Sequence, residues 1–270
     1  MISANLQLQD LAAAIAHVKR GNHIASQHRK RASLTSKLAS LVTNPSVPFV
    51  KSMTTIERHA ELIFAETTFQ KAILGIVYSG DWLQFIKEAC VVCCSIPLIT
   101  LTASYASLNM RTGVQIYRLL ACYLEVMDAE SVAAGTGAQH PDIDNDFRSG
   151  VLLGTGMTHI FLSLLPSRIT AVMKLLGYKG DRKEGLETLA KAGGWSPDLS
   201  KPDPGISVES EGLRRPIADM ALLIFHLVLS SYTFDGVDIQ YAGKILAWNL
   251  KRFPSGTCRL FSVVYQLVTE

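Results

Sequence analysis

Apolar residues recur at three- and four-residue steps along most of this chain, whereas strict alternation of apolar and polar residues is almost absent. The first such repeat covers about residues 5–30. A second begins at Thr54, which together with Glu57 has the spacing of a capping box. Because a 3.6-residue period belongs to an amphipathic helix, the pattern predicts an all-α fold. The apolar positions of the two segments are Leu8, Leu11, Ile15 and Val18, and Leu62, Ala65, Phe69, Ile73 and Ile76.

The rest of the chain continues in the same way, with Gly, Pro and Asp residues that end one helix and start the next. Residues 129–145 are small and polar, and they predict a loop. A further helix starts at Asp181, where Glu184 follows three residues later. The other predicted helices cover residues 81–89, 110–121, 147–165, 166–177, 216–234, 238–253 and 255–268.

Each predicted helix has one apolar face, and stacked antiparallel hairpins are the economical way to bury such faces. We therefore expect a TPR-like α-α superhelix, which is a solenoid of helical hairpins. The N-terminal helical region covers residues 1–193. Residues 194–213, polar and rich in Pro, predict a flexible linker or loop. Residues 214–270 form degenerate TPR-like helices that we expect to be truncated at the C-terminus.

The C-terminal region fits part of the tetratricopeptide pattern when Pro254 closes a repeat. His226 and Thr233 fall where an aromatic or large apolar residue and a tyrosine are expected, so the repeat is predicted to be degenerate. Residues that satisfy the pattern are Ala242 at the small position, Leu246 at the next large position, and Leu229 with Ser230 at the leucine-small pair.

Composition narrows the function classes. The 270 residues are 48% hydrophobic and 18% charged, which excludes intrinsic disorder. A net charge of +3 does not favour a nucleic-acid partner, because such binding depends on phosphate neutralisation. The five cysteines form no disulfide framework, and this favours a reducing compartment.

Candidate chemistry is sparse, and we expect no catalytic residues, no cofactor and no metal. Cys90, Cys93 and Cys94 have the spacing of half a zinc or redox site, but a second half is missing from the sequence. The glycines of the segment 150–156 resemble a phosphate-binding loop, yet helix packing explains them better because no Lys-Ser or Lys-Thr follows. His226 lies in an apolar helix, where a hydrogen-bonded core histidine is the expected role.

Two uncharged stretches are long enough to be membrane spans, namely 89–110 and 149–167. Pro97 disfavours the first as a stable spanning helix, and the glycines of the second favour a soluble core helix. The basic run 28–31 is interpreted as a solvated helix end, with an anionic-membrane or nuclear-import patch as the alternative.

Several motifs resemble the tetratricopeptide-repeat protein 39 family and its fungal relatives, known as inclusion-body-clearance or mitochondrial outer-membrane proteins. The similarity runs from about residue 10 to residue 270, and the fungal branch fits best. The matching stretches are RHAEL (58–62), AILGIVYSGDW (72–82), FIKEA (85–89), LSLLPSR (162–168), LGYKGD (176–181) and KRFPSG (251–256).

This resemblance implies a non-enzymatic helical-repeat scaffold that acts in clearing protein inclusion bodies together with lipid-droplet proteins. It implies a cytoplasmic location, with a nuclear pool as an extension. The alternative is a peripheral protein of the mitochondrial outer membrane or of lipid droplets, with a role in lipid or sterol homeostasis. A third hypothesis, a lipid or sterol carrier, is motivated by the apolar segments 150–176 and 216–234.

Members of this family are longer than 270 residues, so we expect the chain to be a fragment or an incomplete gene product. Residues 90–107 have no counterpart in the family pattern, which passes directly from the position of Ala89 to that of Leu108. We interpret this block as a retained intron, and a lineage-specific insertion is the alternative.

Overall fold

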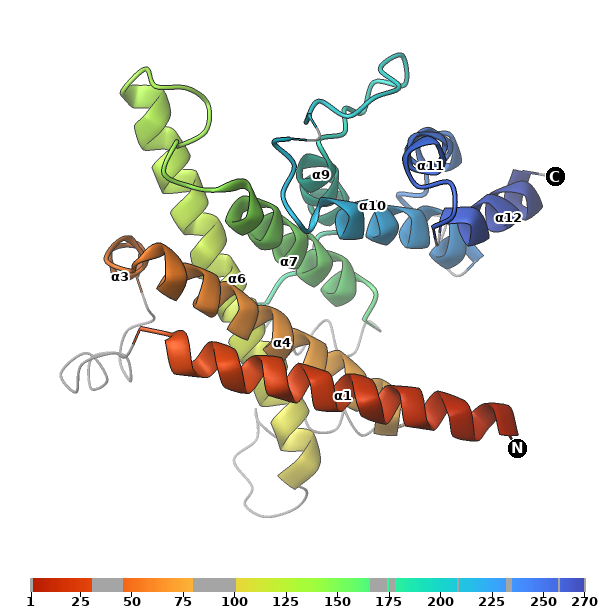
Figure 1. Cartoon of the computed structure of the whole chain (residues 1–270), viewed down its shortest axis with the longest axis horizontal. Helices are drawn as coiled ribbons and strands as arrows, with labels where there is room; N and C mark the ends of the chain where they lie inside the picture. Colours follow the sequence, from red (N-terminus) through yellow and green to blue (C-terminus); the bar gives the residue numbers. More distant parts are fainter. Residues whose placement is uncertain are drawn as a thin grey trace. The chain divides into compact units, whose positions relative to one another are not determined.

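The structure is a computed structural model that describes residues 2–30, 46–79, 101–165, 174, 178–207, 209–231, 235–256 and 258–269 (Figure 1). Every regular element among these residues is a helix, as the periodicity predicts. The chain divides into two compact units. Unit 1 consists of Met1–Pro141 and Leu165–Tyr178, and unit 2 consists of Asp142–Leu164 and Lys179–Glu270.

Unit 1 contains four described helices, which are α1 (Ile2–His28), α3 (Val47–Lys51), α4 (Thr55–Ser79) and α6 (Leu101–Ala133). Helix α1 packs antiparallel against α4, and α4 also packs against α6 (Figure 1). The rings of Phe69 and Tyr117 meet edge to face between α4 and α6, with centroids 6.3 Å apart. The buried core between these helices includes Leu62, Ala65, Phe69, Met110, Val114, Tyr117 and Leu120.

The predicted capping box at the start of α4 is confirmed. The backbone N–H of Thr54 donates to Glu57 Oε2 at 2.8 Å, and the backbone N–H of Glu57 donates to Thr54 Oγ1 at 3.2 Å. Each side chain thus satisfies a backbone donor that the first helical turn leaves open. The hydrogen bond from Thr54 lowers the pKa of the Glu57 carboxyl from its ordinary value.

Unit 2 contains α7 (Asn145–Ser163), α9 (Arg182–Gly193), α10 (Arg215–Leu223), α11 (Ile239–Arg252) and α12 (Cys258–Thr269). Each helix packs against the next one along the chain, as stacked hairpins require. Aspartates cap three of them, because Asp144, Asp181 and Asp238 accept a hydrogen bond from the backbone N–H three residues later. The predicted start of a helix at Asp181 is confirmed.

Helix α7 is a core helix, as its glycines predict. A Cβ on Gly156 would lie only 2.8 Å from Cγ of the buried Leu189 on α9. Gly156 therefore allows α7 and α9 to approach closely. Within the part of the chain that the structure describes, no helix is both long and apolar enough to cross a membrane.

The helix predicted over 216–234 does not continue regularly. After α10 the chain forms a π-helical turn, η1 (Ile224–Val228), and a 3₁₀ turn, η2 (Leu229–Ser231). The wider π turn lets three consecutive residues, Phe225, His226 and Leu227, all face the core. The periodic pattern could not predict this, because it assumes a constant 3.6 residues per turn.

The loop predicted over 129–145 begins later than expected, since α6 continues to Ala133. The Pro-rich segment 194–213 lies inside unit 2, and its ends are packed although we expected a segment too polar to pack. Trp195 is buried, and the backbone N–H of Leu213 donates to Asp146 Oδ1 at 2.7 Å. The three-region division and the flexibility of the segment stay predictions.

Several predicted features fall on residues that are not described, and the helix predicted over 81–89 is one of them. Residues 90–100 of the suspected intron, with Cys90, Cys93 and Cys94, lie outside the described residues, as does most of the helix predicted over 166–177. The remainder of the block, residues 101–107, forms the beginning of α6.

Candidate functional site

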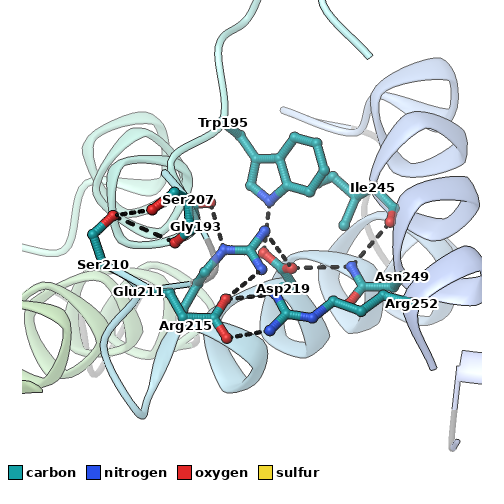
Figure 2. A network of polar contacts seen from close by, with 10 residues as sticks. All are labelled: Gly193, Trp195, Ser207, Ser210, Glu211, Arg215, Asp219, Ile245, Asn249 and Arg252. Carbon is teal, nitrogen blue, oxygen red and sulfur yellow. Dashed lines mark hydrogen bonds and ion pairs between the residues drawn. The ribbon is translucent and has the colours of Figure 1, made fainter. Parts of the chain in front are cut away.

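The most concentrated polar chemistry of unit 2 lies around two charged residues of α10. Arg215 and Asp219 are four residues apart, so they lie on the same face of the helix. Both side chains are only 1% exposed, which is rare for charged residues. A buried charge requires a partner and hydrogen bonds, and Figure 2 shows how the surrounding segments provide them.

Each of the three guanidinium nitrogens of Arg215 has a hydrogen bond or an ion pair with a neighbouring oxygen. Its Nε donates to the carbonyl oxygen of Gly193 at 3.0 Å, and its Nη1 donates to Glu211 Oε2 at 3.1 Å. Its Nη2 forms an ion pair with Asp219 Oδ2 at 3.4 Å. Its Cζ lies 4.2 Å from the ring centroid of Trp248, within cation–π range. Arg215 thus connects α9, the following loop and α11 to α10.

Asp219 is the acceptor at the centre of the network. The indole Nε1 of Trp195 donates to Asp219 Oδ1 at 2.6 Å, and Asn249 Nδ2 donates to Asp219 Oδ2 at 3.0 Å. Burial raises the pKa of this carboxyl above its ordinary value, and the charge of Arg215 together with these hydrogen bonds opposes the rise. The carboxylate therefore joins the loop after α9 to α11.

Glu211 and Arg252 form the outer edge of the network. Arg252 Nη1 donates to Glu211 Oε2 at 2.6 Å, and Arg252 Nη2 donates to Glu211 Oε1, so the pair is bidentate. The hydrogen bond from Arg252 lowers the pKa of Glu211. Glu211 thereby fixes the end of the Pro-rich loop to the last turn of α11.

Two tryptophans pack against the polar network. The rings of Trp195 and Trp248 meet edge to face, with centroids 5.9 Å apart. Lys244 lies 5.6 Å from the ring centroid of Trp195 and donates to the carbonyl oxygens of Ser196 and Asp198, at 2.9 Å each. The beginning of the loop is thus fixed to α11 as its end is.

The network has the chemistry of a structural clamp. Two arginines balance two carboxylates, and each charged group is already bound by another side chain or a carbonyl. A general acid or base needs an open position toward a substrate, whereas the carboxylate of Asp219 is 1% exposed and accepts two hydrogen bonds. The arrangement holds α9, α10 and α11 in one fixed orientation.

The comparison with known proteins identifies the family. The model of the Iml2/Tetratricopeptide repeat protein 39 family matches residues 4–263. The chain belongs to this family. A curated relative from Caenorhabditis elegans, tetratricopeptide repeat protein ttc-39B, is 26% identical over 255 residues. These residues cover 94% of this chain and 36% of the relative. No solved structure matches the chain significantly.

The family resemblance deduced from the motifs is thereby confirmed, whereas the fungal branch stays a prediction. TPR-like proteins are helical-repeat proteins that typically bind other proteins. The positions that fit the tetratricopeptide pattern are also positions that the structure shows to be buried. Ala242 and Leu246 are buried at the positions expected for a small and a large core residue, and Ser230 is buried as well.

His226 has the role that the sequence predicts, that of a hydrogen-bonded core histidine. Its Nδ1 accepts a hydrogen bond from the backbone N–H of Asp238 at 3.0 Å, which implies a proton on Nε2. Its ring lies edge to face with those of Phe225 and Tyr241. Burial lowers the pKa of His226 from 6.5 to about 4. The neutral imidazole therefore packs as a core aromatic group.

Two residues of the basic run 28–31, Arg29 and Lys30, are bound to other parts of unit 1, against our expectation of a solvated helix end, whereas His28 is exposed as expected and Arg31 lies outside the described residues. Arg29 forms a bidentate ion pair with Glu61, with contacts of 2.6 and 2.7 Å, and lies 3.8 Å from the ring centroid of Phe64. Lys30 donates to the carbonyl oxygen of Ser52 at 2.5 Å. These two cations connect the end of α1 to α4 and to the α3–α4 turn, because the antiparallel packing brings those groups within reach.

The expectation that the chain holds no metal can be compared with the described residues only. Among the described residues, no three His, Cys, Asp or Glu side chains lie close enough together to hold a metal ion. Cys122 is exposed and Cys258 is buried, and both are free thiols.

Sequence reasoning missed the network on α10. One signal was available, because Arg215 and Asp219 are oppositely charged at the i,i+4 spacing inside an otherwise apolar segment. Nothing in the sequence indicated that Trp195 and Asn249 would reach the same carboxylate, since they lie 24 and 30 residues away from Asp219.

Proposed function

We propose that this chain is part of a non-enzymatic helical-repeat scaffold that acts in clearing protein inclusion bodies together with lipid-droplet proteins. The observation that carries the proposal is the match to the Iml2/TPR 39 family over residues 4–263. The chain covers 36% of its relative from C. elegans, so the activity belongs to the whole protein that contains it. We propose a cytoplasmic location with a nuclear pool.

The packing of unit 2 supports a scaffold. An interaction surface built from several helices needs their orientation to be fixed, because binding then orders fewer groups. The network around Arg215 and Asp219 fixes α9, α10 and α11 by buried polar contacts. The side chains of Arg215 and Asp219 thus hold these helices together.

The experiment is a clearance assay in cells with the full-length protein. A fluorescent aggregating reporter is induced and then repressed, and the decay of inclusions is followed with and without the protein. We expect slower decay without it, and co-purification of inclusion and lipid-droplet proteins with the tagged protein. Unchanged decay together with a set of bound proteins that lacks both classes would refute the proposal.

A second candidate function is peripheral docking on the mitochondrial outer membrane or on lipid droplets, with a role in lipid or sterol homeostasis. Lys19 and Arg20 are exposed on α1, and Asp10 is the only acidic residue up to Lys51. Such a surface favours anionic lipid. Carbonate extraction of isolated mitochondria and droplets tests it. A peripheral protein is released by carbonate, whereas absence from both fractions before extraction contradicts this function.

A further inference from the structure

The second half of the Pro-rich loop is fixed at both of its ends. The backbone N–H of Gly205 donates to the carbonyl oxygen of Gly194 at 2.7 Å. At the other end, Gly212 lies against the first turn of α7, where the structure leaves no room for a Cβ. We call the described residues between these contacts, 205–207 and 209–212, the strap. The strap therefore lies between two fixed points on the core of unit 2.

Ser207 and Ser210 form a hydroxyl pair in the strap, before Glu211. Their Oγ atoms lie 2.8 Å apart, and the backbone N–H of Ser210 donates to the carbonyl oxygen of Ser207 at 3.2 Å. Figure 2 shows the two hydroxyls pointing toward each other, while the Glu211 carboxylate points toward Arg215 and Arg252. Both serines are exposed. The turn that they close leads directly into the residue that binds both arginines.

The sequence around Ser207 is acidic. Asp203, Glu209 and Glu211 lie within four residues of it, and no Lys or Arg lies in the same window. A backbone hydrogen bond and a hydrogen bond from the Ser207 hydroxyl lower the pKa of the Glu209 carboxyl. Acidic side chains that follow a serine are the feature that acidophilic serine kinases recognise, because their substrate grooves are basic. The charge pattern therefore fits this class of kinase.

The exposure of Ser207 follows from its place between two helices of one unit. The strap belongs to the connection from α9 to α10, and both helices lie in unit 2. In a stack of helical hairpins, neighbouring hairpins cover the faces of the helices, whereas the connecting loops lie along the edges of the stack. Access to Ser207 is thus a property of this internal connection and not of either end of the chain.

We propose that Ser207 is a phosphorylation site for an acidophilic serine kinase, and that the phosphate releases the strap from α11. The kinase transfers the γ-phosphoryl group of ATP to Ser207 Oγ. The bond from this phosphorus to the bridging oxygen of ADP breaks, an O–P bond to Ser207 forms, and the hydroxyl proton passes to the base of the kinase. The proposal concerns the polar network of unit 2 and is independent of the scaffold function.

Three effects of the phosphate act in the same direction. A phosphoryl group on Ser207 Oγ displaces the Ser210 hydroxyl, which lies only 2.8 Å from that oxygen. The phosphate adds about two negative charges beside Glu209 and Glu211, and these groups repel one another. The Arg252 side chain is 21% exposed, so the phosphate competes with Glu211 for its guanidinium. The link from Glu211 to Arg252, which joins the strap to α11, therefore weakens.

The first experiment tests the kinase reaction on the full-length protein. The purified protein is incubated with an acidophilic serine kinase and MgATP, and phosphopeptides are identified by mass spectrometry. We expect phosphate on Ser207, and Glu209→Gln should slow its incorporation by about fivefold or more because an acidic determinant is lost. Glu187→Gln on α9 is the matched control with an unchanged rate, since Glu187 is also exposed but lies outside the strap.

The second experiment measures what the phosphate does to the strap. Phosphoserine is encoded at position 207 or, as the control, at position 200, and hydrogen exchange is followed by mass spectrometry. Ser200 is exposed in the same loop, but Lys201 follows it and it lies outside the strap. With phosphate at 207, we expect amide exchange in the strap and in the last turn of α11 to accelerate about threefold or more, and this effect to shrink as salt is added. Phosphate at 200 should leave both regions unchanged.

Three results would overturn the proposal. The first is the absence of phosphate on Ser207 after incubation with the kinase. The second is incorporation into Glu209→Gln at the rate of the parent protein. The third is exchange in the last turn of α11 that is unchanged or slower with phosphate at 207, or equal for the two positions. Unchanged exchange in peptides from α1 and α4 shows that the protein remains folded. No inclusions are involved in either experiment, so the scaffold function is tested separately.

Discussion

At the scale of single residues, the most distinctive feature of unit 2 is a balanced set of buried charges. Arg215 and Asp219 are almost fully buried, and each is held by segments distant in the sequence. A buried pair of this kind contributes little net stability compared with well-packed apolar residues, but removing one partner leaves an uncompensated charge. Variants of the two residues are therefore informative.

The first prediction concerns Arg215→Met. We expect the free energy of unfolding to fall by about 3–5 kcal/mol, because Asp219 stays buried without its cation. Replacing both residues, with Met at 215 and Leu at 219, should recover part of this loss. Lys183→Met is the matched control, since Lys183 and Glu187 have the same i,i+4 spacing but are exposed, and here the expected change is below about 0.5 kcal/mol. Urea denaturation measures all three, and equal effects at 183 and 215 would contradict the prediction.

The second prediction concerns pH and His226. Burial lowers its pKa from 6.5 to about 4, so between these values the unfolded chain binds a proton that the folded chain does not. Stability from this group is full above pH 6.5 and decreases as the pH falls toward 4, with a loss of about 2 kcal/mol at pH 5 as an upper value. In His226→Gln this part of the pH dependence should vanish. An unchanged slope of unfolding free energy between pH 7 and pH 5 in the variant would contradict the assignment.

At the scale of elements, helix spacing depends on small residues at crossing points. Gly156 of α7 faces Gly185 and Leu189 of α9, and an added methyl group would lie 3.0 Å from the carbonyl oxygen of Gly185. A carbonyl in a helix cannot move without moving the helix.

The third prediction follows from this contact. Gly156→Ala should lower the unfolding free energy by about 1–3 kcal/mol, although alanine has the higher helix propensity. Gly205→Ala is the control, because its nearest contact would be an ordinary 3.6 Å and it lies in the loop. Thermal melts of both variants decide the matter, and a Gly156→Ala protein as stable as the parent would show that α7 and α9 can move apart freely.

At the scale of the whole molecule, the chain forms two compact units with separate cores. The polar network lies entirely in unit 2, while the Arg29–Glu61 pair and the α4–α6 core lie in unit 1. The effect of a substitution should therefore stay within the unit that contains it.

The fourth prediction uses hydrogen exchange measured by mass spectrometry. In Arg215→Met, amide exchange should accelerate in peptides from α9, α10 and α11, which the network joins. Peptides from α1 and α4 should exchange as in the parent protein. Acceleration in both units to the same extent would mean that they unfold as one cooperative body.

A large part of the fold could be predicted from local pattern. The capping box of Thr54 and Glu57, the start of a helix at Asp181, the buried face of Leu62, Ala65 and Phe69, and the core role of His226 all follow from spacing and residue type. These features depend on interactions within a few residues or on the helical period, and both can be recognised in the amino-acid sequence.

The sequence by itself determined the fold class and, through its motifs, the family, because helical periodicity and short motifs are local properties of the chain. Only the tertiary structure decided where the charges meet. Asn249 reaches Asp219 across 30 residues, and Arg29 reaches Glu61 across 32. It also decided that residues 225–227 all face the core through a π turn. The physical reason is that partners distant along the chain are selected by packing geometry, which no pattern of adjacent residues encodes.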